Sequence, residues 1–294
     1  MKRLLSLAAA GVMCGATMFG ASGVAGASTA PSAGALHVQP GGLLVRAPGY
    51  ASQNSQSPTV SVNWSGYAVQ SSKKFNYVHA TFVQPAVKCG GQKYQLTSNW
   101  VGIDGYNDQT VEQDGTSVQC SGPDHMTPIY KAWYEMFPGP SANVFNVSPG
   151  DIIDISVKYT NSKFTLTETD LTSGKTSSLT RKNPTAKRNS AEWVIERPAF
   201  CNSTETKCFL TELANFKTTT MSGATASVDG GPVQSVGKFR NIPMYMFCPI
   251  QRGLISLDTV GGLSGQSFTT TFDRSGTTTP ITLGPRALSS PAGH

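Results

Sequence analysis

The chain has 294 residues, 23 of them basic and 17 acidic, which gives a formal net charge of +6 at pH 7. A charge this small, with no aromatic or glycine-rich RNA motif beside the basic residues, argues against a nucleic-acid-binding protein. Charged residues make up only 14% of the chain, so fewer carboxylates must stay ionised and less stability is lost on acidification.

The first 27 residues have the parts of an export signal. Basic residues at positions 2 and 3 precede an apolar, small-residue stretch that ends at the A-x-A cleavage site 25–27. Glycine and alanine interrupt this stretch, which falls short of the ~18 strongly apolar residues of a membrane span. We therefore expect residues 1–27 to be a signal peptide and the protein to be secreted, extracellular and free of the membrane once the signal is cleaved.

Three further segments follow the predicted signal. Residues 28–58 are rich in Ala, Gly, Pro, Ser and Gln, with little hydrophobic periodicity, and we interpret them as a propeptide or flexible leader. We expect acid to release this leader by protonating carboxylates that pair with its few basic groups, such as Arg46. Residues 59–288 are expected to form one folded domain, and residues 289–294 a loose tail.

The domain has the pattern of an all-β protein. Apolar and polar residues alternate over 151–159, which predicts a half-buried strand. Further strands are predicted over 78–82 and 164–169, whereas a helical period is suggested only by a short turn near 211–216. Glycines and prolines separate the strands at intervals suited to a sandwich. We expect a single domain of two antiparallel sheets packed face to face.

One of the six cysteines lies in the predicted signal, which leaves five in the exported chain. Five cysteines in that setting suggest two disulfides and one leftover thiol. Cys201 and Cys208 bracket a short polar loop and form the first expected pair, and Cys89 with Cys120 forms the second. Cys248 is then expected to be unpaired and buried. A catalytic cysteine is not expected, because no histidine motif accompanies any of the five.

Several catalytic and metal-binding patterns are missing from the chain. There is no H-E-x-x-H pair, the four histidines are scattered, and no metal or cofactor is expected. There is no G-x-S-x-G elbow and no D-T-G or D-S-G sequence. The remaining candidates for chemistry are carboxylates and amides.

Four short motifs carry such residues. Because residues two apart in a strand face the same way, Glu192 shares a face with Glu196, and Lys131 shares one with Glu135. In chain order the motifs are NWSGY (63–67), WVGIDG (100–105) with a following glutamine, AWYE (132–135) and AEWVIE (191–196).

In their order and residues the motifs resemble those of the glutamic peptidases (eqolisins), a family of secreted acid endopeptidases. The resemblance implies a concanavalin A-like β-sandwich with its cleft on the concave face of one sheet. It implies that Glu196 is a general base, that Gln113 stabilises the oxyanion, and that polypeptides are the substrates. Positions that line the family's substrate cleft are matched by Trp64, Trp100, Asp104 and Glu135.

Two departures from the family pattern affect the expected site. Lys131 stands where the fungal members have an acid, and on the face of Glu135 it would add a cation to the cleft, which would change subsite preference or lower the pKa of a neighbouring carboxylate. The spacing from Trp100 to Gln113 is one residue shorter than in the fungal pattern, which makes Gln109 a competing amide.

Two other functions stay open at this point. A concanavalin A-like sandwich can host a retaining glycosidase, for which Glu135 and Glu196 would need carboxyl groups about 5–5.5 Å apart. The tryptophans could also belong to a non-catalytic carbohydrate-binding module. We favour the peptidase, acting as a monomer, because glycosidase chemistry gives no role to Gln113 or to the WVGIDG turn.

Overall fold

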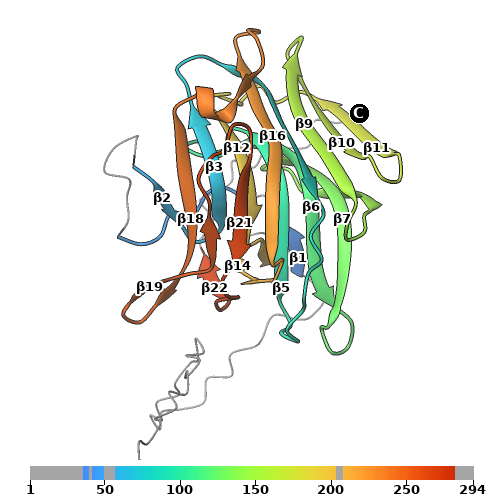
Figure 1. Ribbon diagram of the computed structural model, residues 1–294, viewed down its shortest axis with the longest axis vertical. Coiled ribbons are helices and arrows are strands. Elements are labelled where there is room, and N and C mark those ends of the chain that lie inside the picture. The colour runs from blue at the N-terminus through green and yellow to red at the C-terminus, as the bar shows by residue number, and fades with distance from the viewer. Residues whose placement is uncertain (1–35, 40–41, 50–56, 203–207, 282–294) are drawn as a thin grey trace, which may run out of the picture.

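The computed structural model describes residues 36–39, 42–49, 57–202 and 208–281 (Figure 1). The expected signal peptide and the expected tail lie outside the described residues. Where the chain is described, strands account for its regular structure apart from one short 3₁₀ turn, η1 (Val236–Lys238). The helical turn expected near 211–216 is wrong, since this segment is extended and contains the short strand β15 (Glu212–Leu213).

Two main sheets form the sandwich, and the larger one carries all four motifs. Its ten strands are β2 (Thr59–Ser61), β3 (Trp64–Gln70), β5 (Gln95–Ile103), β6 (Val111–Ser121), β7 (Thr127–Phe137), β8 (Ala142–Asn146), β12 (Ser190–Glu196), β15, β18 (Asn241–Ile250) and β19 (Gly253–Ser256). The order is β19-β18-β3-β12-β5-β6-β7-β8, with β2 beside β18 and β15 beside β5. Only these two side pairings are parallel in the described sheet.

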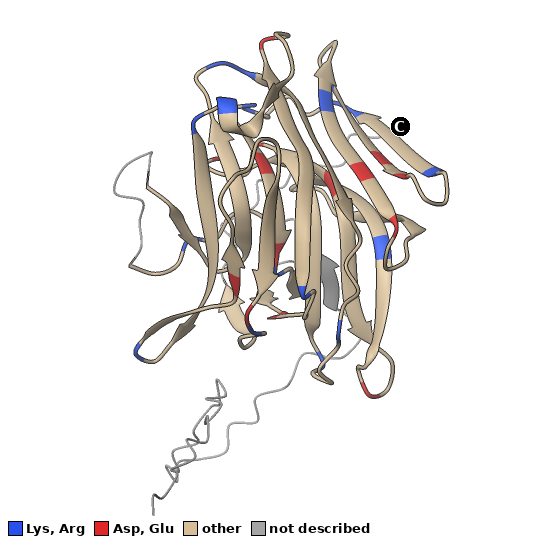
Figure 2. Ribbon diagram, viewed as in Figure 1, with Lys and Arg blue, Asp and Glu red and all other residues tan. Residues whose placement is uncertain are grey.

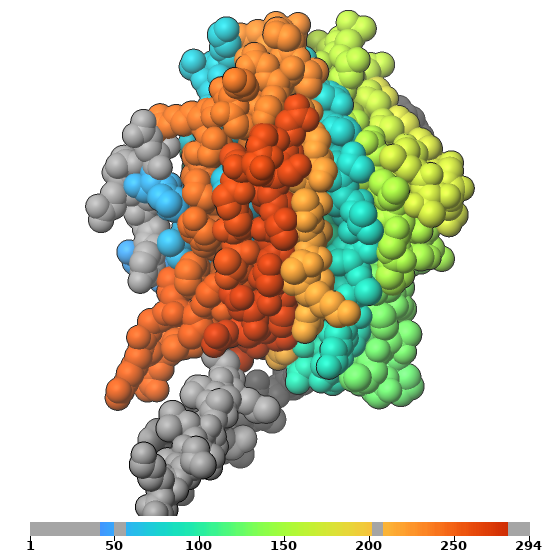
Figure 3. Space-filling model, in the orientation of Figure 1, coloured from blue at the N-terminus to red at the C-terminus, as the bar shows by residue number. Residues whose placement is uncertain are grey.

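The second main sheet has eight strands. They are β4 (Phe75–Val83), β9 (Ile152–Thr160), β10 (Lys163–Asp170), β11 (Lys175–Arg181), β16 (Thr218–Val228), β17 (Gln234–Ser235), β20 (Asp258–Val260) and β21 (Phe268–Phe272). Strands distant in sequence lie side by side in it, since β4 pairs with both β16 and β9 (Figure 3). The fold therefore confirms the expected two-sheet sandwich.

A third, four-stranded sheet was not expected from the sequence. It consists of β1 (Leu36–Gln39), β13 (Ala199–Asn202), β14 (Cys208–Leu210) and β22 (Thr279–Ile281), in the order β1-β13-β14-β22. β1 belongs to the leader and pairs antiparallel with β13 along its whole length. The described part of the leader is therefore bound to the domain rather than detached from it.

Alternating side chains explain how the two main sheets are joined. In β9, Ile153, Ile155 and Val157 are fully buried while their polar neighbours are not, as the alternation predicted. They pack in one core with residues of the facing sheet, among them Trp193. Removing such surface from water, at about 25 cal/mol per Å² of apolar area, is the main force holding the sheets together.

The structure contains both expected disulfides. One joins Cys89 to Cys120, and the other joins Cys201 to Cys208 across the β13–β14 pair. Cys248 is buried and carries a free thiol, again as expected. The second disulfide fixes the pairing of these two short strands.

Carboxyl groups are buried between the sheets. Figure 2 shows lysine and arginine mainly at strand ends and turns, whereas several acidic positions lie within strands. Asp114 on β6 is 1% exposed and Glu168 on β10 is 2% exposed, and neither has a cationic partner in the described part of the chain. Burial raises the pKa of both well above the usual range, and the charge of Asp114 raises that of Glu168 further.

A third buried acid has the same character. Asp258 on β20 accepts a hydrogen bond from the hydroxyl of Ser65, yet burial still raises its pKa to about 7. In each case the neutral acid fits the interior better than the carboxylate does. The folded protein is therefore suited to a pH at which these groups are protonated.

The buried acids predict a protein that loses stability as the pH rises toward neutrality. A group whose folded-state pKa is raised contributes its full stability below the unfolded value, near pH 4, and loses it as the pH rises through the folded-state value. Asp114→Asn with Glu168→Gln should gain on the order of 1–3 kcal/mol at pH 7 and little at pH 3. Melting temperatures at the two pH values measure this.

The exposed carboxylate of Asp124, replaced in Asp124→Asn, serves as the control. Its amide keeps the oxygen that accepts from the N–H of Met126. An equal gain at pH 3 and pH 7 in the double variant would contradict the assignment to buried charge.

Candidate active site

Cross-strand register brings the four motifs to one face of the ten-stranded sheet. Glu192 of β12 pairs with Gly102 of β5, Gly102 pairs with Gln113 of β6, and Gln113 pairs with Glu135 of β7. Directly paired residues project to the same side, and so do residues two apart in a strand. Glu196 therefore shares this face with Gln113, on the diagonal across the intervening strand β5.

Trp100 lies on the same face of β5, between the residue that pairs with Glu196 (Ser98) and the residue that pairs with Gln113 (Gly102). It pairs with Val194 on one side and with Gly115 on the other, and Gly115 pairs with Trp133. A Cβ atom at position 115 would lie 2.6 Å from the Cβ of Trp100 and 2.2 Å from the carbonyl oxygen of Asn99. Glycine at this position is therefore required for the close packing of the Trp100 side chain.

Glu196 is held by the indole of Trp100. The Nε1–H of Trp100 donates to Oε2 of Glu196 at 2.9 Å, and Glu196 is only 1% exposed. A hydrogen bond to a buried carboxyl oxygen fixes the position of the side chain. A catalytic role for this carboxyl group stays a prediction.

Gln113 is held by Glu135. The Nε2–H of Gln113 donates to Oε2 of Glu135 at 2.8 Å, and both side chains are fully buried. Gln109, the competing amide, lies before β6 in an exposed bend and does not belong to the strand. The structure therefore brings Gln113, not Gln109, onto the face that carries Glu196.

An apolar group, which we call the aromatic cluster, lies on the same face of the sheet as these polar side chains. The rings of Trp64 and Trp100 meet edge to face, with centroids 4.8 Å apart and an angle of 80°. Leu43 and Leu44 of the leader pack against the cluster. Its buried members are Trp64, Ala68, Trp100, Tyr106, Val111, Trp133, Phe137, Val194, Ile242 and Met244.

Asp104 has a structural partner of its own. Its backbone is left-handed, with φ of 73°, and its carboxylate accepts from the N–H groups of Arg188 at 2.6 Å and Asn189 at 2.9 Å. It therefore anchors the segment that leads into β12. Nearby Asp108 has its pKa raised to about 7, by burial first and then by the charge of Asp104. A substrate contact for Asp104 stays a prediction.

Lys131 projects from the same face as Glu135 but has a different neighbour. It pairs with Ser117, and its ammonium donates to Oδ1 of Asn146 on β8. The cation is thus drawn toward the edge of the sheet that β8 forms. Its influence on substrate preference stays a prediction.

Two further buried acids lie near the site, of which sequence reasoning missed Glu112 and named Glu192 only as a residue on the face of Glu196. Glu112 accepts from Nδ2 of Asn183 at 2.6 Å, and burial followed by the charge of Asp104 raises its pKa well above the usual range. Burial likewise raises the pKa of Glu192, which is fully buried. Glu112, Gln113 and Asp114 are polar residues in succession, so they do not alternate with apolar residues. The sequence therefore gave no sign that both faces of β6 are buried.

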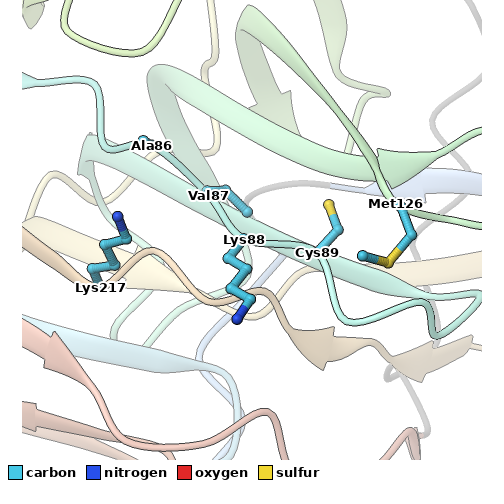
Figure 4. A pocket seen from close by; sticks show the side chains of 6 residues that line it. All are labelled: Ala86, Val87, Lys88, Cys89, Met126 and Lys217. Carbon is cyan, nitrogen blue, oxygen red and sulfur yellow. The ribbon is translucent and has the colours of Figure 1, made fainter.

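Two open pockets on the described surface lie apart from these residues. One of about 340 Å³ is lined by Ala86, Val87, Lys88, Cys89, Met126 and Lys217 (Figure 4). The amines of its two lysines point in opposite directions, so they do not converge on one anion. The described residues contain no group of three metal-ligating side chains, and no helix among them is long and apolar enough to cross a membrane.

Comparison with known proteins connects this geometry to a family. Residues 62–244, which include all four motifs, match the model of the Peptidase A4 family. The chain belongs to this family. It is accordingly a glutamic endopeptidase, or eqolisin, which hydrolyses peptide bonds. Membership argues against the two alternatives, a glycoside hydrolase built on Glu135 and Glu196 and a carbohydrate-binding module.

Individual relatives agree with this assignment. Scytalidopepsin B of Scytalidium lignicola is 31% identical over 198 residues, which cover 62% of this chain and 73% of that protein. A crystal structure of scytalido-glutamic peptidase with a transition-state-analogue inhibitor has a TM-score of 0.62 and 25% identity, and covers 72% of this eqolisin and 98% of that chain. The structure of SCP-B, an eqolisin in complex with the tripeptide Ala-Ile-His, has the same fold, with a TM-score of 0.61 and 24% identity over 72% and 98% of the two chains.

The bond between Trp100 and Glu196 predicts a selective effect of one substitution. Trp100→Phe keeps an aromatic ring but removes the N–H donor, and it should lower kcat/KM about 10- to 100-fold, because a hydrogen bond to a charged group contributes about 1.5–3 kcal/mol. Trp133→Phe is the matched control, since the indole N–H of Trp133 has no partner among the described residues. Equal losses in both variants would assign the effect to packing instead.

Proposed function

We propose that this eqolisin is an exported acid endopeptidase with Glu196 as general base and Gln113 as oxyanion stabiliser. The observation that supports the proposal is the placement of the two side chains on one face, each held by a neighbour. Trp100 donates to Glu196, and Gln113 donates to Glu135. The aromatic cluster on the same face excludes water and would strengthen each electrostatic interaction in the cleft.

In the proposed reaction, the Glu196 carboxylate takes a proton from a water molecule as the water oxygen attacks the scissile carbonyl carbon. The carbonyl π electrons move to its oxygen, which becomes an oxyanion and accepts a hydrogen bond from the amide N–H of Gln113. The tetrahedral intermediate then collapses, the C–N bond breaks, and Glu196 returns the proton to the leaving amine. The base is regenerated, and one water has been added across the bond.

Glu135 has a positioning role in this proposal. A carboxylate can only accept hydrogen bonds, so it selects the amino end of the Gln113 amide rather than its carbonyl end. The amide is thereby turned to act as a donor, which is the role an oxyanion requires. Trp64 and Trp100 are proposed to form apolar walls for the substrate chain.

Function in acid follows from the choice of groups. An amide does not titrate, so an oxyanion donor of this kind is unchanged at low pH. A carboxylic acid, with an ordinary pKa of about 4.3, still supplies a base in mild acid, where a histidine, with an ordinary pKa of about 6.5, is charged. The buried acids Asp114 and Glu168 support the same working range, because they favour the folded state when protonated.

We further propose that residues 28–58 are a propeptide. Leu43 and Leu44 of this leader cover the aromatic cluster, so removal of the leader would open the cleft. Arg46, expected to pair with a carboxylate, instead donates to Oδ1 of Asn107 at 2.9 Å. Acid release of the leader through an Arg46 ion pair therefore has no support in the described residues.

Export is proposed from two independent features. The N-terminal residues have the pattern of a signal peptide, and the two disulfides are typical of proteins in oxidising, extracellular surroundings. A secreted monomer acting on polypeptides is consistent with both.

The dyad is tested with a quenched-fluorescence peptide across pH 2–8, after incubation of the full chain in acid. Glu196→Gln removes the base and should lower kcat by a factor of about 10²–10⁴ or more. Gln113→Ala removes the oxyanion donor and should lower kcat by about 10²–10³. Both variants should keep the fold and melting temperature of the parent at pH 3 to within a few degrees.

Two results would overturn the proposal. One is full activity in the Glu196→Gln variant, and the other is absence of cleavage at every pH tested by the parent from which residues 28–58 have been removed. Asn143→Ala, a change at an exposed position on the edge strand β8, is the control for nonspecific effects of substitution in this sheet.

A further inference from the structure

Residues 43–47 of the leader, which we call the leader strand, run antiparallel to residues 60–62 and meet them at an isolated β-bridge between Arg46 and Ser61. The N–H of Ala47 donates to the carbonyl of Val60 at 3.0 Å. The N–H of Val62 donates to the carbonyl of Val45 at 2.9 Å. Pairing with a strand edge is a general way to hold an extended peptide, because main-chain hydrogen bonds do not depend on its sequence.

The side chain of Asn63 holds the backbone of the leader strand at two points. Its Nδ2 donates to the carbonyl of Leu43 at 2.9 Å, and its Oδ1 accepts from the N–H of Val45 at 2.8 Å. Asn63 is 2% exposed, and its own carbonyl accepts from the N–H of Arg197 at 2.8 Å. This clamp therefore adjoins the residue that follows Glu196.

A carboxamide suits the backbone of an extended chain. It offers one donor group and one acceptor, which match the C=O and N–H that such a chain presents. It does not titrate, so the clamp is unchanged in acid. Ser61 helps to fix the Asn63 side chain, because its hydroxyl donates to Oδ1 of Asn63 at 3.0 Å.

The side chains of the leader strand fill two kinds of site. Leu43 and Leu44 pack against the aromatic cluster. The guanidinium of Arg46 lies over the ring of Tyr106, 4.9 Å from its centroid, and donates to Oδ1 of Asn107 at 2.9 Å. A ring face and an amide oxygen attract a cation without an acidic partner.

From these contacts we infer that the leader strand marks the path of a substrate chain on one side of the dyad. Asn63 is the positioning residue that holds the substrate backbone on this path. The side-chain sites select two adjacent large aliphatic residues followed, two positions later, by a basic residue. This inference rests on the proposed function and deepens it by naming a substrate class.

Two quenched peptides test the selectivity. They are identical except that one contains Leu-Leu-Val-Arg and the other Ser-Ser-Val-Glu, and both are given to the acid-incubated parent. The first should be cleaved with a kcat/KM at least about tenfold higher, because the second loses the apolar burial of two leucines and the contact of the arginine with the Tyr106 ring. Equal values would overturn the inferred selectivity.

Asn63→Ala tests the clamp. It should raise KM for the Leu-Leu-Val-Arg peptide about tenfold while kcat changes less than twofold, since two backbone hydrogen bonds are lost and no reacting group is touched. Gln234→Ala, which removes an exposed amide on β17, is the control and should leave KM unchanged. An unchanged KM in Asn63→Ala, or a fall in kcat alone, would overturn the positioning role.

A second measurement avoids any change to the protein. The synthetic peptide of residues 42–49 should inhibit the parent competitively, and N-methylation of its Val45 nitrogen, which removes the donor to Asn63, should raise the inhibition constant about tenfold. Equal inhibition by the two peptides would overturn the inference even if Asn63→Ala does not fold. Failure of the dyad itself is separate, because it would appear as cleavage that survives Glu196→Gln.

Discussion

The packing of Trp100 is the contact on which the arrangement of the cleft depends. Its indole lies in the central row of the ten-stranded sheet, meets Trp64 edge to face, and donates to Glu196. It can lie there because Gly115 on the neighbouring strand has no side chain to displace it. A single glycine therefore couples the backbone of β6, which carries Gln113, to the position of the glutamate on β12.

The protein has few charged side chains, and many of its acidic side chains are buried inside the sandwich. An interior of this kind is costly at neutral pH, where carboxylates must either ionise without partners or hold a proton against the solvent. In acid the cost disappears, so the interior and the proposed chemistry favour the same conditions. Stability and catalysis are thus matched through the same class of side chain.

The class of fold could be predicted from the sequence, because the alternation in β9 and the spacing of glycines and prolines are local patterns. The strands that carry the four motifs could be predicted from the motifs themselves. It also predicted both disulfides, since one pair brackets a short loop. The burial of Glu112 and Asp114 on β6 could not be predicted in this way, because it depends on which elements cover each face of that strand. The third sheet was missed for a similar reason: β1 has meaning only through its pairing with β13, some 160 residues away.

Asn63 illustrates most clearly what could not be predicted from the sequence. It lies within the first motif, yet the tryptophan beside it was the residue that the pattern marked as functional. Its contacts with Leu43 and Val45 are set by the path of a segment with no periodicity of its own. Only the folded chain shows that the amide and the backbone meet.

The pairing of β1 with β13 covers one edge of β13. Loss of the leader would leave one edge of β13 with a row of N–H and C=O groups that no strand satisfies. Bare edges of this kind recruit other extended chains. The Cys201–Cys208 disulfide would keep β13 in its extended conformation, because it joins β13 covalently to β14. Removal of the proposed propeptide would therefore favour self-association through this edge, to an extent that rises with protein concentration.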